Sequence, residues 1–318
     1  MDEYFSKLNE VLLDYINYSE LYDFGEFSAI DSITNIILSS RLPSFMDKIK
    51  NRFGLSKSMS LSLEFFDFIG DDYAKHFFDV VKNDGIIYVY DPKGIDHATS
   101  FHEDGVKKIY FPYSENICDS FTLTHEMLHD MNLDVNNVNE MRNLYTEYIS
   151  IFGEMLLSDY ISENYDIKCS VNNRYTFDSC FLKAVKVNFY LELLKCFMDN
   201  GYINKYNLDK IILRYNPYYH GYLFKMVDNI VDNGQFPIIY EYRYVIGILL
   251  SCYSKDLYND GKFNIEMFKY VNENINDMID EDLYDLLSLD VADDFTLALT
   301  NDSYEKLSKS YVKIMGKA

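Results

Sequence analysis

Apolar side chains recur every three or four residues over most of this chain, the spacing of helices that bury one face. The pattern predicts helices over residues 2–18, 25–52, 59–82, 119–133, 141–163, 176–200, 207–214, 219–231, 237–259, 263–280 and 302–315. The 318 residues include only 5 prolines and 13 glycines, so few positions interrupt these helices. The prediction is a mainly α fold.

The hydrophobic period changes before residue 119. Residues 86–90 and 108–111 are rich in β-branched and aromatic side chains, which favours strands. Residues 91–107 carry turn signals and form either a turn or a middle strand. We therefore expect one small antiparallel sheet directly before the helix predicted at 119–133.

Composition excludes several classes of protein. Hydrophobic residues make up 48% of the chain, which permits a sizeable core and excludes general disorder. The net charge of −22 opposes binding to nucleic acid or to an anionic membrane surface. We find no signal peptide and no apolar stretch long enough to span a bilayer. The five cysteines are scattered, which is typical of free thiols, so we expect a cytoplasmic protein.

Candidate chemistry is concentrated in an H-E-x-x-H motif at residues 125–129. Residues four apart on a helix lie on one face, so the imidazoles of His125 and His129 project in the same direction. This spacing suits two ligands of a tetrahedral Zn²⁺, with Glu126 at the flank, within reach of a water on the metal. The alternative is a helix that carries two histidines and no metal.

A third ligand is expected from the next helix, where Glu140, Glu147 and Glu154 share one face. They are spaced roughly 10 Å apart along the axis, so only one of them can reach the metal. Glu147 is the preferred candidate because its neighbours over residues 144–157 are nearly all apolar, and a carboxylate in such surroundings requires a partner. The alternative for each glutamate is a solvated helix face.

Three segments resemble the M3 metallopeptidases, in the oligoendopeptidase F branch. Residues 85–125 resemble the strand segment that leads into the family's T-L-x-H-E-x-G-H helix. Residues 147–154 are similar to its E-x-x-S-x-F-x-E block, whose first glutamate is the third zinc ligand. Residues 239–247 resemble its tyrosine-rich Y-x-Y-x-Y-x-x-G segment. The resemblance extends over residues 60–260.

This resemblance implies a helical metallopeptidase catalytic domain, of the gluzincin type and shortened at the N-terminus, with zinc at the floor of a substrate channel. The single domain would cover residues 1–318, with an N-terminal helical part (1–58), a catalytic core (59–260) and C-terminal helices (261–318). The implied partner is a short peptide substrate, which the domain hydrolyses. The oligomeric state is not predicted.

The resemblance also implies a role for each site residue. One Zn²⁺ per chain is held by His125, His129 and Glu147, and Glu126 activates the attacking water. Zinc is the default over Mn²⁺ or Co²⁺ for this donor set. Tyr242, or Tyr240 if the register differs, donates a hydrogen bond to the developing oxyanion, with aromatic packing as the alternative.

Further contacts are expected around these residues. Strand 108–112 can pair with an extended peptide by β-addition. Ser150, Glu154 and Asp130 are candidates to orient the ligand side chains, and an ordinary helix position is the alternative for each.

The chain departs from the family pattern at several positions. Leu128 replaces the family's glycine, and Asn132 and Asn233 occupy positions of family histidines. His220 is the nearest substitute for the second of these histidines. Family members are also longer, since they have an additional N-terminal lobe, so a more open channel can admit larger substrates. The departures support an alternative, a catalytically impaired member that binds peptide or metal. A helical bundle with no metal is a third possibility.

Overall fold

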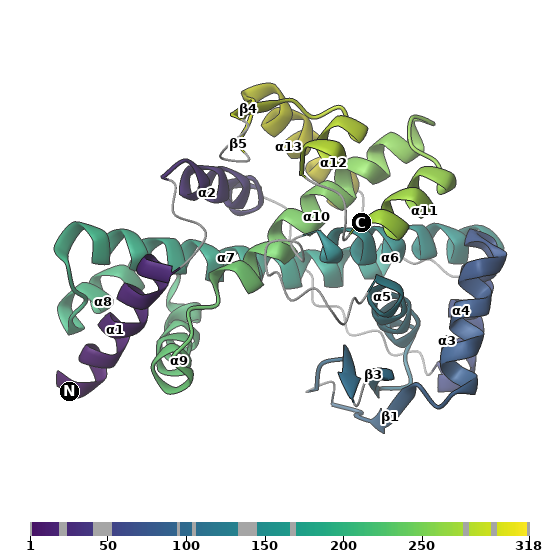
Figure 1. Ribbon diagram of the computed structural model, residues 1–318, viewed down its shortest axis with the longest axis horizontal. Helices are drawn as coiled ribbons and strands as arrows, with labels where there is room; N and C mark the ends of the chain where they lie inside the picture. Colours follow the sequence, from purple (N-terminus) through teal and green to yellow (C-terminus); the bar gives the residue numbers. More distant parts are fainter. Residues whose placement is uncertain are drawn as a thin grey trace.

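The computed structural model describes residues 2–18, 24–40, 53–93, 96–103, 106–132, 145–165, 170–275, 280–293 and 298–316 (Figure 1). The helices are α1 (Asp2–Tyr18), α2 (Phe24–Ser39), α3 (Leu55–Ile69), α4 (Asp71–Lys82), α5 (Cys118–Asn132), α6 (Thr146–Asn164), α7 (Ser170–Asn200), α8 (Lys205–Ile212), α9 (Pro217–Asn233), α10 (Ile238–Asn259), α11 (Ile265–Asn274), α12 (Asp280–Leu286) and α13 (Asn301–Met315). The strands are β1 (Ile86–Tyr90), β2 (Thr99–Glu103), β3 (Val106–Tyr113), β4 (Val291–Asp293) and β5 (Ala298–Leu299).

The mainly α prediction is confirmed, and most helix boundaries agree with the hydrophobic spacing within a few residues. The helix predicted over 59–82 is in fact two, α3 and α4, which are separated at Gly70. Asp71 and Asp72 lie in the first turn of α4, where carboxylates favour a new helix N-terminus. Parts of other predicted helices, such as residues 41–52 and 276–279, lie outside the described residues.

The small sheet before α5 is mixed, where we expected an antiparallel sheet. β3 is its central strand and pairs with β1 in parallel and with β2 antiparallel. Alternating apolar positions predict a strand but do not reveal its direction, which explains the error. β4 and β5 form a second, antiparallel pair that the sequence pattern did not predict. β-Addition of a peptide to residues 108–112 is contradicted at Ile109 and Tyr110, which pair with β1 on one side and with β2 on the other, whereas the rest of this segment pairs with one described strand only.

Helix α5 is enclosed on several sides. It packs against α6, α3 and strands β2 and β3, and Figure 1 shows the sheet on the far side of α5 from α6. Its buried side chains include Phe121, Leu123 and Met127. The helix is therefore fixed by its apolar face, while its histidines are partly exposed.

Helix α10 crosses α6 and α7 near the middle of the molecule (Figure 1). Gly247 permits the close approach of α10 to α6, since a Cβ there would lie 3.2 Å from the Cβ of Glu147 and 3.1 Å from the Tyr148 nitrogen. Ser251, one turn later, donates a hydrogen bond to the Tyr148 carbonyl at 2.9 Å. The backbone of α10 is thus held against the start of α6.

A helix that spans a membrane must be both long and apolar. Each helix within the described ranges is either too short or too polar to span a bilayer.

Candidate metal centre

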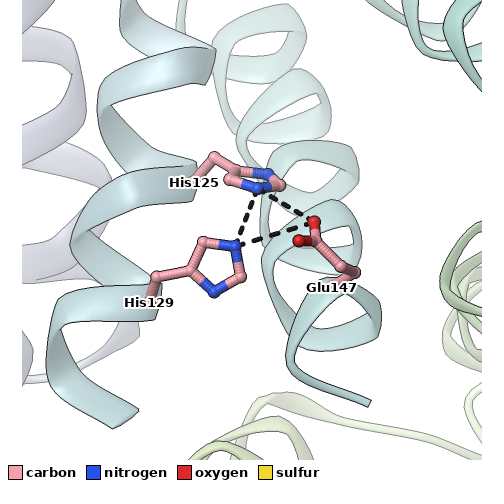
Figure 2. A group of neighbouring side chains, drawn as sticks. All are labelled: His125, His129 and Glu147. Atoms are coloured by element: carbon pink, nitrogen blue, oxygen red, sulfur yellow. Dashed lines mark hydrogen bonds and ion pairs between the residues drawn. The ribbon is translucent and has the colours of Figure 1, made fainter. Parts of the chain in front are cut away.

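Two imidazoles from α5 face each other at the surface of the helix pair α5–α6. His125 and His129 lie one turn apart, and their Nε2 atoms are separated by 3.0 Å (Figure 2). Their side chains are 15% and 16% exposed, so both remain accessible to a small solute. The four-residue spacing of the motif accounts for this arrangement without help from the rest of the fold.

Glu147 reaches the two rings from the first turn of α6 (Figure 2). Its Oε2 atom lies 3.3 Å from Nε2 of His125 and 3.6 Å from Nε2 of His129. The side chain is only 2% exposed, and Oε2 makes no hydrogen bond to any described residue. The three side chains that we predicted as ligands therefore meet at one point, with a buried carboxylate oxygen directed at both rings.

The outer nitrogens of both rings have oxygen neighbours. Nδ1 of His125 lies 2.7 Å from Oε1 of Glu154, and Nδ1 of His129 lies 3.3 Å from the Ser150 hydroxyl. A carboxylate accepts a hydrogen bond from Nδ1–H, which leaves the lone pair of Nε2 free to bind a metal. Two of the three residues expected to orient the ligands thus contact the rings.

Asp130, the third such candidate, does not contact either ring. Its Oδ2 atom lies 2.9 Å from Nε2 of His76 on α4, and Lys107 donates to its backbone carbonyl at 2.7 Å. Asp130 therefore connects α5 to α4 and β3. This result follows from helix geometry, since residue 130 projects about 100° away from residue 129.

His125 and Glu147 shift each other's pKa in opposite directions. Burial by itself would lower the pKa of His125, but the carboxylates of Glu147 and Glu154 outweigh it and raise this pKa well above the ordinary value. Burial would raise the pKa of Glu147, yet the two imidazoles hold it well below its ordinary value. Without a metal, an imidazolium and a carboxylate thus neutralise each other.

The donor atoms fit a tetrahedral ion. Zn²⁺ bonds of about 2.0–2.1 Å place neighbouring tetrahedral donors roughly 3.3 Å apart. The observed separations of 3.0, 3.3 and 3.6 Å scatter around that value. Two nitrogens, one buried oxygen without a hydrogen bond, and partial exposure match a site with three protein ligands and one open position.

Helix α10 contributes residues to the other side of Glu147. Arg243 Nη2 lies 3.2 Å from Oε1 of Glu147, and the guanidinium stacks on Tyr240 with 4.2 Å between its carbon and the ring centroid. Tyr244 lies beside both, 3.4 Å from Nη2. Sequence reasoning missed Arg243 and Tyr244. The available signal was their three- and four-residue spacing from Tyr240, which places all three on one helix face.

The two tyrosines that we predicted for oxyanion binding occupy different positions. Tyr240 is 49% exposed and belongs to the face of α10 that carries Arg243. Tyr242 is 7% exposed and lies in the hydrophobic core. The geometry favours the exposed ring for contact with a substrate.

Glu126 is anchored by the sheet. It is buried, and the hydroxyl of Ser100 on the edge strand β2 lies 3.0 Å from its Oε2 and 2.8 Å from its backbone oxygen. The motif glutamate is therefore fixed between α5 and the edge of the sheet.

The departures from the family pattern have structural explanations at two positions. Leu128 fits over Gly153 of α6, where a Cβ would overlap the leucine Cδ1 atom. The Asn132 amide donates to the Leu128 carbonyl at 3.0 Å and to Asn272 at 2.6 Å, so it acts in packing. Asn233 and its possible substitute His220 both lie on α9. His220 forms a hydrogen bond with the Tyr215 carbonyl at 2.9 Å, and Asn233 is exposed.

Comparison with known proteins gives a result for the fold only. No family model and no curated protein sequence matches the chain. Its structure is similar to that of a protein assigned as a peptidase from Chlamydophila abortus, with a TM-score of 0.53 at 12% identity. It is also similar to a protein assigned as an oligoendopeptidase F from Bacillus anthracis, with a TM-score of 0.51 at 10% identity. Each alignment covers 100% of this chain and 56% of the other, so this chain spans little more than half the length of either.

Proposed function

We propose that this chain is a zinc-dependent peptidase that hydrolyses short peptides. The observation that carries the proposal is the meeting of two Nε2 atoms and a buried carboxylate oxygen that makes no hydrogen bond, with separations of 3.0, 3.3 and 3.6 Å. The fold supports it, because the two similar solved structures described above are assigned as peptidases. The expected ligands are His125, His129 and Glu147.

Each residue has a distinct task in this proposal. When bound, zinc supplies a Lewis acid that polarises a peptide carbonyl and lowers the pKa of water. Glu126 takes the proton of the attacking water and delivers it to the leaving amine. Glu154 and Ser150 hold the imidazoles in the tautomer that binds metal. Tyr240, the exposed one of the two candidate tyrosines, donates to the developing oxyanion.

The sheet offers a surface for an extended substrate. β2 is an edge strand, and its Ser100 contacts Glu126. A peptide that adds to the edge of β2 that pairs with no described strand would therefore lie next to the proposed general base. We prefer β2 to β3 for this role because Ile109 and Tyr110 of β3 are paired on both sides.

The test compares the wild type with E126Q and with E163Q, a control on the exposed face of α6. Metal is removed with a chelator and zinc is restored, and bound zinc and cleavage of a mixed-peptide library are then measured. We expect all three proteins to bind one zinc, and E126Q alone to lose cleavage. Equal turnover by the wild type and E126Q would refute the mechanism.

The same experiment separates the alternative function. Stoichiometric zinc with no cleavage of any peptide by the wild type would favour a catalytically impaired protein that binds metal or peptide. That alternative is motivated by the departures at Leu128, Asn132 and Asn233. Absence of zinc from the wild type would contradict the zinc-dependent peptidase and the metal-binding form of the alternative.

A further inference from the structure

The two carboxylate oxygens of Glu147 have different surroundings. Oε2 faces the imidazoles of His125 and His129 and makes no hydrogen bond. Oε1 lies on the opposite side, 3.2 Å from Nη2 of Arg243. A free carboxylate can bind a metal through one oxygen or through both, and these surroundings distinguish the two oxygens before any metal arrives.

Arg243 is itself held in place. Its guanidinium carbon lies 4.2 Å from the centroid of the Tyr240 ring and 5.1 Å from that of Tyr244, within the range of cation–π attraction. Nη2 also lies 3.4 Å from the Tyr244 hydroxyl. Gly247, one turn further along α10, permits the close approach of this helix to Glu147, since a Cβ added there would lie only 3.2 Å from Glu147 Cβ. The position of the arginine is thus set by α10, independently of the histidines.

Arg243 keeps its charge in this environment. A guanidinium stays protonated in proteins, and Arg243 faces the Glu147 carboxylate at 3.2 Å. A cation next to Oε1 disfavours a divalent ion at the same oxygen, because like charges repel in a partly desolvated site. The ion is therefore confined to the side of Oε2.

We propose that Arg243 is a positioning residue that restricts Glu147 to one-oxygen metal ligation and thereby keeps a coordination position open. The inference rests on the metal site of the proposed function, but it does not depend on peptidase activity. A carboxylate bound through both oxygens would occupy an additional position around the ion, at the expense of water or substrate.

The test replaces the guanidinium of Arg243 and measures the coordination number of the bound metal by visible absorption. Co²⁺ is added to the metal-free wild type, to R243Q and to R214Q, and visible absorption spectra are recorded. Arg214 is a matched control, since it pairs with Glu192 at 3.5 Å and is 57% exposed. Absorption of Co²⁺ weakens as its coordination number rises, so we expect a weaker band in R243Q and a wild-type band in R214Q.

Zinc affinity gives a second measurement on the same proteins. We expect R243Q to bind zinc about 10–100-fold more weakly, the loss typical of an outer partner of a metal ligand. An unchanged spectrum together with affinity equal to that of R214Q would overturn the role of Arg243 while leaving the zinc site intact. A wild type that binds neither ion would overturn the metal site and this inference together.

The wild type alone also decides the question should R243Q fail to fold, as judged by its circular dichroism. A crystal structure of the zinc-loaded wild type shows how many oxygens of Glu147 lie at bonding distance from the ion. One carboxylate oxygen at bonding distance supports the inference, and chelation through both oxygens of Glu147 overturns it.

Discussion

Leu128 and Gly153 fit together between α5 and α6, and a methyl group added at Gly153 tests this fit. The new Cβ would overlap Cδ1 of Leu128 and lie 3.7 Å from the ring of Phe268. Leu128 is fully buried, so it has no open space into which to rotate. Overpacking of a core costs about 1–3 kcal/mol, and alanine gains about 1 kcal/mol over glycine inside a helix. We therefore expect G153A to destabilise the protein by up to about 2 kcal/mol.

The same substitution should act oppositely when the leucine is shortened. L128A alone costs about 2–5 kcal/mol, because it leaves a cavity in the core. In that background the methyl group of G153A meets empty space, so only the gain in helix propensity of about 1 kcal/mol remains. The difference between the two effects of G153A is a coupling energy of about 1–3 kcal/mol.

Urea denaturation of the four metal-free proteins, followed by far-ultraviolet circular dichroism, measures this coupling. Tryptophan fluorescence is not an option because the chain contains no Trp. If G153A changes the free energy of unfolding equally in both backgrounds, within about 0.5 kcal/mol, the two side chains are independent and the reasoning fails.

Three further predictions concern the metal site. E154Q should weaken zinc binding by about tenfold in a competition titration, since the neutral amide of glutamine holds Nδ1 of His125 less strongly than the carboxylate of Glu154 does. Zinc affinity equal to that of the wild type would contradict this role of Glu154. S100A should lower peptide turnover roughly fivefold, because it removes a hydrogen bond of about 1 kcal/mol to Glu126. Bound zinc should remain at the wild-type level. Unchanged turnover would exclude the contact from catalysis. The melting temperature of the chelated protein should fall on both sides of a plateau. The raised pKa of His125 makes the stabilisation from this residue complete below about pH 6.5, and this stabilisation is lost as the pH rises through that pKa. The lowered pKa of Glu147 makes the stabilisation from this residue complete above about pH 4.5, and this stabilisation is lost as the pH falls through that pKa. A flat profile in which H125Q matches the wild type would refute the pairing.

The part of the site that comes from one helix could be predicted from sequence. The spacing of His125 and His129 fixes a common face, because helix geometry is local. The prediction of Glu147 as a ligand had a different basis, because a carboxylate among apolar neighbours requires a partner. Its side chain lies with the two rings, which is consistent with that reasoning.

The parts that depend on how elements pack could not be predicted. The rotation of α10 about its axis decides that Arg243 faces Glu147 and stacks on Tyr240 while Tyr242 enters the core, and the periodic pattern of α10 alone does not fix this rotation. Strand direction in the sheet is likewise a property of chain topology. The match of Leu128 with Gly153 involves two helices, so neither residue reveals it alone.

The sequence positions of the site residues have a consequence for how the protein assembles. The ligands come from α5 and α6, which are neighbours in the chain, whereas Arg243 and Gly247 on α10 follow about a hundred residues later. Short loops close at lower entropic cost than long ones, so the imidazoles and Glu147 can meet while α10 is still being synthesised. We expect the ion to join a nascent helical pair early, and the arginine to reach the carboxylate later, once α10 has been synthesised.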